Sequence, residues 1–512
     1  MNRRSNENGI AMIIALFMVL ALSVLGSSLM FISQSETWSS SNYRITSQAR
    51  YAAESGVHHA ANFLLNTGTY TPPSTSSATD PLTGYTTTAT PVLSSGNNQA
   101  VVLSSDTTKW PSNYPYATAQ TNFANTVKNE NISLSGSKAT YHASAKLLSM
   151  QAYTDAYSGQ PSTIQTWEIT SVGTVEGARN SSVEVSAVVE QQLVPLYRYA
   201  AFATANGCAA LSFAGGATTD SYDSSVGPTN IAGTFQNSGG NVGTNGNLTE
   251  VGNPTQVAGT LSTPRSGVGA CTANNVTALT VANNPDFHVT GGLVELSQSV
   301  QYQTPTLAAT PPQISTTFAG NGTSSACPTG VSGGATCTNA GGVWTITPAS
   351  PSTPVIMGDV RLNAGATLRM NPGLYVINSI LQNGNSSIAV LGGTPCVSNC
   401  TVTVQVAGQN QSTPIDLTGG GISNPTMDPS RFQIIYPGTG TVRLNGGASA
   451  AALIYAPNAT SNFNGNADFY GAVITNVLSA TGGINIHYDR HLQRAATTSS
   501  NPMMSSFTWK TY

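Results

Sequence analysis

The residues best suited to bind a metal lie near the C-terminus, in the stretch IHYDRHL. His487, Asp489 and His491 stand at two-residue steps, which would place all three side chains on one face of a β-strand. Two imidazoles and a carboxylate can hold a transition metal. Polar residues are also typical of the last coil of a stacked repeat, where they keep the open edge from pairing with other chains. We favour this structural role, so the sequence predicts no metal and no cofactor.

Carboxylates elsewhere raise the questions of calcium binding and hydrolysis. Asp220 and Asp223 stand among hydroxyl residues in TDSYDSS, a composition that suits calcium, although Asp more commonly caps turns. Enzymes that cleave polysaccharides need clustered carboxylates. The acids of the C-terminal half share no spacing; they include Asp359, Asp416, Asp428 and Asp468. Since no P-loop, nucleophile elbow or dinucleotide-binding glycine pattern occurs either, we predict that the protein is not an enzyme.

Six cysteines can form three disulfides, and they are Cys208, Cys271, Cys327, Cys337, Cys396 and Cys400. The middle two and the last two each enclose a short loop, so we expect them to pair locally and the first two to pair with each other. This pairing rests on proximity, since six cysteines allow fifteen connectivities. Zinc is less favoured, because no Cys-x-x-Cys occurs and no histidine lies near these pairs. Disulfides require an oxidising compartment.

The composition limits the class of protein. Only 8% of the 512 residues are charged, the net charge is -3, and there are 50 glycines. Nucleic-acid binding needs a basic footprint, which is missing. Short runs of Val, Ile and Leu between Gly, Asn and Thr are typical of an exported, mainly β protein with many turns.

The positioning elements begin with an apolar run from Ile10 to Ile32. As a helix this run would be about 34 Å long, which is enough to cross a membrane. A cleaved secretory signal has a shorter apolar region and an A-x-A-like site. Neither feature is found here, so the run is not predicted to be such a signal. Arg3 and Arg4 precede the run and the next basic residue is Arg44, so the N-terminus is expected in the cytoplasm and the body outside.

The helical pattern continues beyond the apolar run. Small and apolar residues recur at steps of three and four, namely Ile45, Ala49, Ala52, Gly56, Ala60 and Phe63, and no proline occurs before Pro72. This periodicity predicts one helix over residues 10–66, about 85 Å long, that is amphipathic in its second half. A plain membrane anchor followed by a stalk would show the same pattern.

Gly9, the stretch IAMIIALFMVLALSVLGSSLMF after it and QARYAAESGVHHAANFLL at residues 48–65 together resemble the N-terminal region of PilX-like minor pilins of type IV pili. The resemblance is confined to the part of the chain up to Leu65. It implies that residues 1–9 are a leader, that prepilin peptidase cuts between Gly9 and Ile10 and methylates the new terminus, and that residues 10–66 are a pilin helix in the inner membrane. Other pilin subunits would be the partners.

One residue departs from the pattern of the abundant pilins. Major pilins have Glu at the fifth mature position, where this chain has Ile14. In those pilins the carboxylate is thought to pair with the amino terminus of a neighbouring subunit, as a charge in lipid requires. The K-type minor pseudopilins of type II secretion, which are placed at the tip, also lack it. The resemblance therefore favours a minor, tip-located or initiating subunit.

The exported body is expected in two parts. The sequence predicts a β-rich, pilin-head-like region with a linker over residues 67–200, including a hairpin over 166–193. Residues 201–495 predict a parallel β-solenoid, because VRLNAGAT at 360–367 and VRLNGGAS at 442–449 echo one another and asparagine corners recur at steps of about 18 to 20 residues. Residues 209–227 and 431–492 also resemble a solenoid domain found downstream of PilX-like N-termini. We expect an inserted loop at about 300–350 and a C-terminal tail at 496–512.

The predicted protein is thus mainly β, with a long N-terminal helix, a β-rich head and a β-solenoid. It would serve a type IV pilus or a type II secretion pseudopilus as a minor subunit, aiding assembly, with the solenoid contacting a surface ligand. Two alternatives stay open on the sequence: a statically anchored adhesin or envelope protein, and an anchored carbohydrate-active enzyme.

Overall fold

The computed structural model describes residues 7–511 except 67–68, 76, 109, 129–131, 135–136, 156–160, 177–179, 253–254, 265–270, 272–274, 277–287, 323–325, 351–352, 391–399, 446–449, 467, 496 and 500–502. The chain forms two compact units. The head unit comprises residues 1–155, 159–193 and 499–512, and the solenoid unit comprises residues 156–158 and 194–498.

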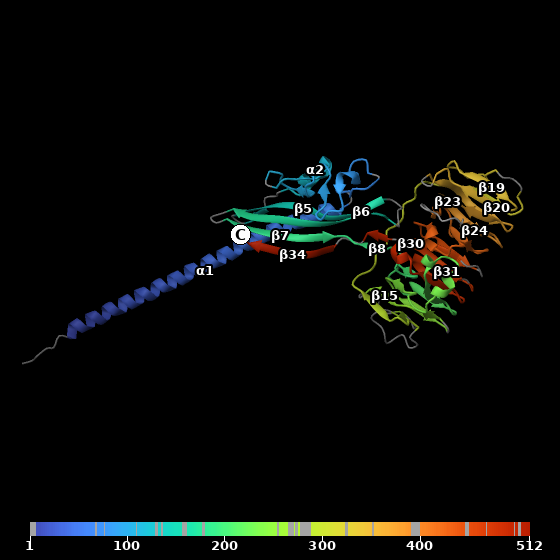
Figure 1. Cartoon of the computed structure of the whole chain (residues 1–512). Helices are drawn as coiled ribbons and strands as arrows, with labels where there is room; N and C mark the ends of the chain where they lie inside the picture. Colours follow the sequence, from blue (N-terminus) through green and yellow to red (C-terminus); the bar gives the residue numbers. More distant parts are fainter. Residues whose placement is uncertain are drawn as a thin grey trace, which may run out of the picture. The chain divides into compact units, whose positions relative to one another are not determined.

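A single helix opens the head unit. Helix α1 (Glu7–Leu65) is continuous over 59 residues, which confirms the predicted long helix (Figure 1). Its first half has no packing partner within the described chain. Its second half packs on a sheet through the predicted small face, in which Ala49, Ala52, Ala60 and Phe63 are buried.

The sheet under α1 has the strand order β3-β5-β6-β7-β34, with β4 paired to β5. Its bounds are β3 (Val102–Ser104), β4 (Ile132–Leu134), β5 (Ser137–Thr154), β6 (Pro161–Glu176), β7 (Ser181–Glu190) and β34 (Met503–Thr511). Strands β6 and β7 are antiparallel and alternate between buried and half-buried residues, which confirms the predicted hairpin. The short strands β1 (Tyr85–Thr86) and β2 (Leu93–Ser94) and the helix α2 (Ala117–Thr126) complete the head, and α2 was not expected from the sequence.

Glycines allow α1 to lie unusually close to the sheet. A β-carbon at Gly173 of β6 would lie 2.0 Å from the carbonyl oxygen of Ala49 and 2.5 Å from the amide nitrogen of Ala53. A β-carbon at Gly56 of α1 would lie 2.2 Å from the Ser171 hydroxyl. All three distances are far shorter than van der Waals contact. Because the atoms near Gly173 belong to the helix backbone, that position requires glycine.

The C-terminal residues are not a tail, and that expectation was wrong. Met503–Thr511 form β34, which pairs antiparallel with β7 from Met503 opposite Glu190 to Thr511 opposite Val183. The solenoid unit is therefore inserted into the head between β7 and β34. The segments that lead into and out of it pair with each other as β8 (Leu193–Pro195) and β33 (Thr497–Ser499).

The solenoid unit is built from parallel strands that stack coil upon coil. Val355 pairs with Tyr375, Thr367 with Ser387, and Thr441 with Thr460. In each pair the second residue stands one repeat further along the chain than the first, so the pairings agree with the repeat seen in the sequence. Its principal strands are β9 (Ala201–Ala203), β10 (Leu211–Ala214), β11 (Thr218–Tyr222), β12 (Val242–Thr244), β13 (Leu248–Val251), β14 (Gln256–Val257), β15 (Leu261–Pro264), β17 (Leu293–Leu296), β18 (Ser315–Ala319), β19 (Thr336–Ala340), β20 (Val343–Thr347), β21 (Val355–Asn363), β22 (Thr367–Met370), β23 (Gly373–Gln382), β24 (Ser387–Val390), β25 (Val402–Val406), β26 (Ile415–Leu417), β27 (Ile422–Ser423), β28 (Phe432–Ile435), β29 (Thr441–Asn445), β30 (Ala450–Asn464), β31 (Asp468–Thr481) and β32 (Asn485–Asp489).

The chain enters and leaves this solenoid in its middle. Strand β9 pairs with β12 on one side and with β31 on the other, and β11 pairs with β14 and with β32. The first and last coils are thus neighbours, and we call their junction the seam. The last coil has no open edge, so the expectation that His487, Asp489 and His491 cap an edge was wrong.

A proline-containing strap, residues 297–314, runs from one end of the solenoid to the other. Along it, the Val300 amide donates to the Asn245 side chain, the Gln303 carbonyl accepts from the Tyr455 hydroxyl, and the Ala308 amide donates to the Gln405 side chain. Strands β18 to β20 then begin the far end, where β18 pairs with β21 and β20 with β22. The expected loop at 300–350 is therefore a strap followed by a coil.

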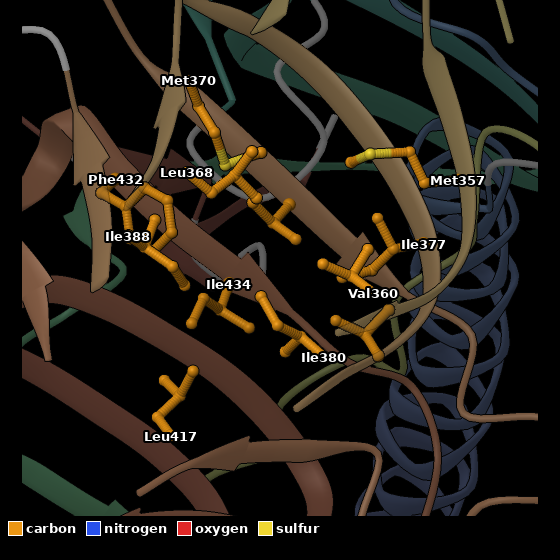
Figure 2. Close-up of a pocket in the computed structure, with 12 residues that line it drawn as sticks. Met357, Val360, Leu368, Met370, Ile377, Ile380, Ile388, Leu417, Phe432 and Ile434 are labelled. Carbon is orange, nitrogen blue, oxygen red and sulfur yellow. The ribbon is translucent and has the colours of Figure 1, made fainter. Parts of the chain in front are cut away.

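The interior of the solenoid is apolar and filled. Figure 2 shows side chains from successive coils, among them Met357, Leu368, Ile380 and Phe432, meeting around a space of about 10 Å³. A space of this size holds one water molecule at most. The apolar side chains around this space stabilise the coils by their burial.

Candidate functional site

The first candidate site is the N-terminal half of α1. Ile10, Ile14 and Phe17 are 64%, 54% and 67% exposed, and no residue of the most apolar stretch of α1 is buried. The helix is long and apolar enough to cross a membrane. Since exposed apolar side chains in such numbers are unfavourable in water, this half requires lipid or other apolar helices around it.

The predicted processing site, between Gly9 and Ile10, lies within α1. The side chains up to residue 9 lie outside the described part of the chain, and the cut stays a prediction. Glu54 lies on the packed half of the helix and forms an ion pair with Arg50 at 2.8 Å. The Arg50 guanidinium also lies 5.3 Å from the ring centre of Trp509 on β34. The contact with Trp509 joins the helix to the sheet, and Glu54 pairs with the arginine that makes it.

The second candidate site is a polar cluster on the seam. His487 of β32 lies between two carboxylates, with Nδ1 2.5 Å from Asp220 of β11 and Nε2 3.5 Å from Asp468 of β31. The Tyr470 ring stacks on the His487 ring, and Phe235 meets it edge-on. Because β31, β32 and β11 are parallel neighbours, the cluster joins the last coil to the first.

The metal ligands considered on the sequence do not converge. Asp489 is fully buried and accepts bonds from the amides of Ser224 and His491 and from the Ser224 hydroxyl. Burial raises the pKa of the Asp489 carboxyl, and the bonds from Ser224 oppose the shift. His487 instead contacts Asp220 and Asp468. Among the described residues no three His, Cys, Asp or Glu side chains form a group able to hold a metal.

The two aspartates considered for calcium are also separately engaged. Asp220 contacts His487. Asp223 accepts bonds from the amide and hydroxyl of Ser225, which lowers the pKa of its carboxyl. Asp223 thus caps the short helix that follows it, as aspartates in turns commonly do.

Two disulfides join described cysteines of the solenoid unit. Cys208 bonds to Cys271 and Cys327 to Cys337. The first closes a loop of 63 residues and links different coils, whereas the second closes 10 residues next to the hairpin of β19 and β20. Cys400 is disulfide-bonded, but Cys396 lies outside the described residues, so the pairing of these two stays a prediction.

One buried acid was not noticed in the sequence. Glu250 of β13 is 8% exposed, and neither carboxylate oxygen has a hydrogen-bond partner among the described residues. Burial raises the pKa of Glu250 to about 7, and the nearby His288 opposes the shift. No signal in the sequence marks this residue, since it stands in an ordinary alternating stretch, LTEV.

Glu250 makes the solenoid sensitive to pH. Because its pKa is higher folded than unfolded, the folded form binds more protons, and stability is lost as the pH rises from about 4.5 through 7. We expect Glu250→Gln to remove this loss, gaining up to about 3 kcal/mol at pH 8 and little at pH 4. Urea unfolding of the unaltered protein and of Glu250→Gln at the two pH values measures this gain in the free energy of unfolding. An equal difference between the two proteins at both pH values would contradict the prediction.

The family comparisons identify the N-terminal region. Residues 8–58 match the model described as PilX N-terminal. This N-terminal region is therefore similar to that of PilX proteins. The PilX-like segment ends within the packed half of α1, so it includes both the exposed apolar half and most of the face that lies on the sheet.

The other comparisons with known proteins give no further information on function. Residues 374–495, the later coils of the solenoid, match a domain of unknown function, DUF7305. The search of curated proteins finds no significant match. Among solved structures, the competence-associated pilin ComZ from Thermus thermophilus is similar at 15% identity over 91% of this chain and 98% of that chain, with a TM-score of 0.28. At that TM-score the likeness carries no argument.

Proposed function

We propose that the protein is a minor pilin-like subunit, located at the tip or in the initiating complex of a type IV pilus or a type II secretion pseudopilus. The PilX-like region supports a pilin-like role. The observation that carries the proposal is α1 itself. One uninterrupted helix has an exposed apolar half and a second half that packs on the head. Such a helix can leave the bilayer and pack among others without refolding.

The proposal places the helix in the inner membrane, with its N-terminus in the cytoplasm and the body outside, because the basic residues precede the apolar run. Prepilin peptidase would remove residues 1–9. Ile14 supports a minor subunit, since no acid follows until Glu36 and the helix has no carboxylate to pair with a neighbour's amino terminus. The solenoid would contact a surface ligand, in a role that is structural and not enzymatic.

Cleavage of the leader by prepilin peptidase tests the proposal. In cells that contain prepilin peptidase, we expect mass spectrometry of the purified protein to give a mature N-terminus at Ile10. Gly9→Val should abolish the cut, because a branched side chain replaces the smallest residue beside the scissile bond, whereas the matched change Asn8→Ala should leave it.

A mature protein that still begins at Met1 would instead support the statically anchored adhesin or envelope protein. Deletion of the gene distinguishes the roles further. Loss of filaments with normal synthesis of the major pilin is expected for an assembly subunit, and intact filaments are expected for a separate adhesin.

A further inference from the structure

Strand β34 forms an open edge of the head sheet. It is the last strand in the order β3-β5-β6-β7-β34, and among the described residues it pairs with β7 alone. All nine of its residues are exposed. The backbone amides and carbonyls on its outer side therefore offer a strand-length row of hydrogen-bonding groups, which is the template that another strand pairs with.

The side chains of this edge are apolar where solvated edges are usually charged. Phe507 and Trp509 pair with Ala187 and Val185 of β7, whose side chains are buried on the sheet face that α1 covers. Yet Phe507 and Trp509 are 42% and 51% exposed. Together with Met504, which is 42% exposed, they form what we call the β34 shelf. Lys510, the Arg50 guanidinium beside the Trp509 ring and a bulge after Met504 protect the edge only in part.

A second copy of the chain does not suit this edge. The opposite edge strand, β3, has three residues, and the amide and carbonyl of Val102 already bond to Asn113, so it cannot receive a nine-residue strand. Antiparallel pairing of two β34 strands would rotate one sheet by a half turn. The two α1 helices would then point in opposite directions, which two anchors in one membrane cannot do.

We propose that the β34 edge binds an extended strand from a different pilin-like subunit, with alternating apolar side chains resting on the β34 shelf. Backbone pairing fixes the class of ligand as a β-strand, and the shelf selects apolar residues on the face that α1 covers. The inference rests on the proposed function, because assembly is what brings another pilin head beside this one.

Photo-crosslinking in cells that assemble filaments tests the inference. The full-length protein carries benzoylphenylalanine in place of Phe507, or, as a control, in place of Glu168 on the central strand β6. We expect an adduct from position 507 with another pilin-like subunit, mapped by mass spectrometry to a strand, and at least tenfold less from position 168. An adduct with a second copy, an adduct with a protein outside the pilin class, or no adduct would overturn the proposal.

A double variant distinguishes loss of binding at the β34 shelf from loss of the fold. Met504→Thr with Phe507→Thr keeps residues that favour strands and leaves the Trp509 contact with Arg50 in place, but removes most of the apolar surface of the β34 shelf. We expect it to lower co-purification of the partner at least tenfold with an unchanged melting temperature of the head. Unchanged co-purification would overturn the proposal. If the variant unfolds, hydrogen exchange of residues 503–511 in the unaltered complex decides, since pairing must slow it.

The N-terminus of the same sample separates the two hypotheses. A mature terminus at Ile10 without an adduct refutes the edge interaction alone, whereas a terminus at Met1 refutes the proposed function.

Discussion

Replacing Gly173 with alanine is expected to destabilise the head unit by about 3 kcal/mol or more, because the added methyl group would overlap backbone atoms of α1 and no flexible side chain can move aside. Helix and sheet would have to separate along their whole contact. For a domain of this size the melting temperature should fall by roughly 10 °C. Scanning calorimetry of the full-length protein in detergent, compared with Gly173→Ala, measures the loss.

The head unit also offers a matched control. A β-carbon at Gly96 would lie 3.9 Å from its nearest neighbour, the Ser94 hydroxyl, so Gly96→Ala should leave the melting temperature within about 1 °C. An equal loss for both alanines would mean that the helix does not lie against β6 as closely as the distances at Gly173 require.

Ending the chain after residue 499 is expected to unfold the head unit although the removed residues number few. The truncation deletes β34, which pairs with β7 along most of its length, and it leaves β7 as a bare apolar edge beside the buried core. We expect rapid proteolysis of the head and accumulation in aggregates. Limited trypsin digestion of the membrane fraction, with detection of head fragments, measures this.

The complementary deletion removes far more of the chain and should be tolerated. Met503 pairs with Glu190, so a short Asn-Gly turn in place of residues 191–502 can close a β-hairpin. The shortened chain should keep a protease-resistant head, because it retains every strand of the sheet path and α1. A resistant truncated chain together with a sensitive hairpin chain would refute the insertion of the solenoid into the head.

The elements with a regular period were predictable from the sequence. The steps of three and four from Ile45 to Phe63 define a helix face, and that face is buried on the sheet. The asparagine corners that recur at steps of about 18 to 20 residues define a coil length, and the strand pairings repeat at that length. In both cases the physical cause, one buried side per repeat, is local and therefore visible in a single sequence.

The long-range pairings were not predictable, because nothing near β34 or β32 specifies a partner. The stretch MMSSFTWKT is typical of a short strand, but its partner β7 lies before the whole solenoid unit in the sequence. Proximity in the sequence groups His487 with Asp489 and His491. The contacts of His487 are Asp220 and Asp468, which the seam brings to it. The membrane helix, by contrast, needed no tertiary information, since lipid selects it by composition and length.

The seam sets an order of completion during export. The chain emerges from its N-terminus, so β9 to β11 are outside the membrane long before β31 and β32, which must cover one of their two edges. Until residue 489 has been delivered, the first coil keeps an unpaired edge, and a prematurely ended chain keeps it permanently. The head of such a chain would also be incomplete, because it needs residues 503–511 to cover β7. The position at which the chain enters the solenoid thus makes completion of the first coil depend on delivery of the last.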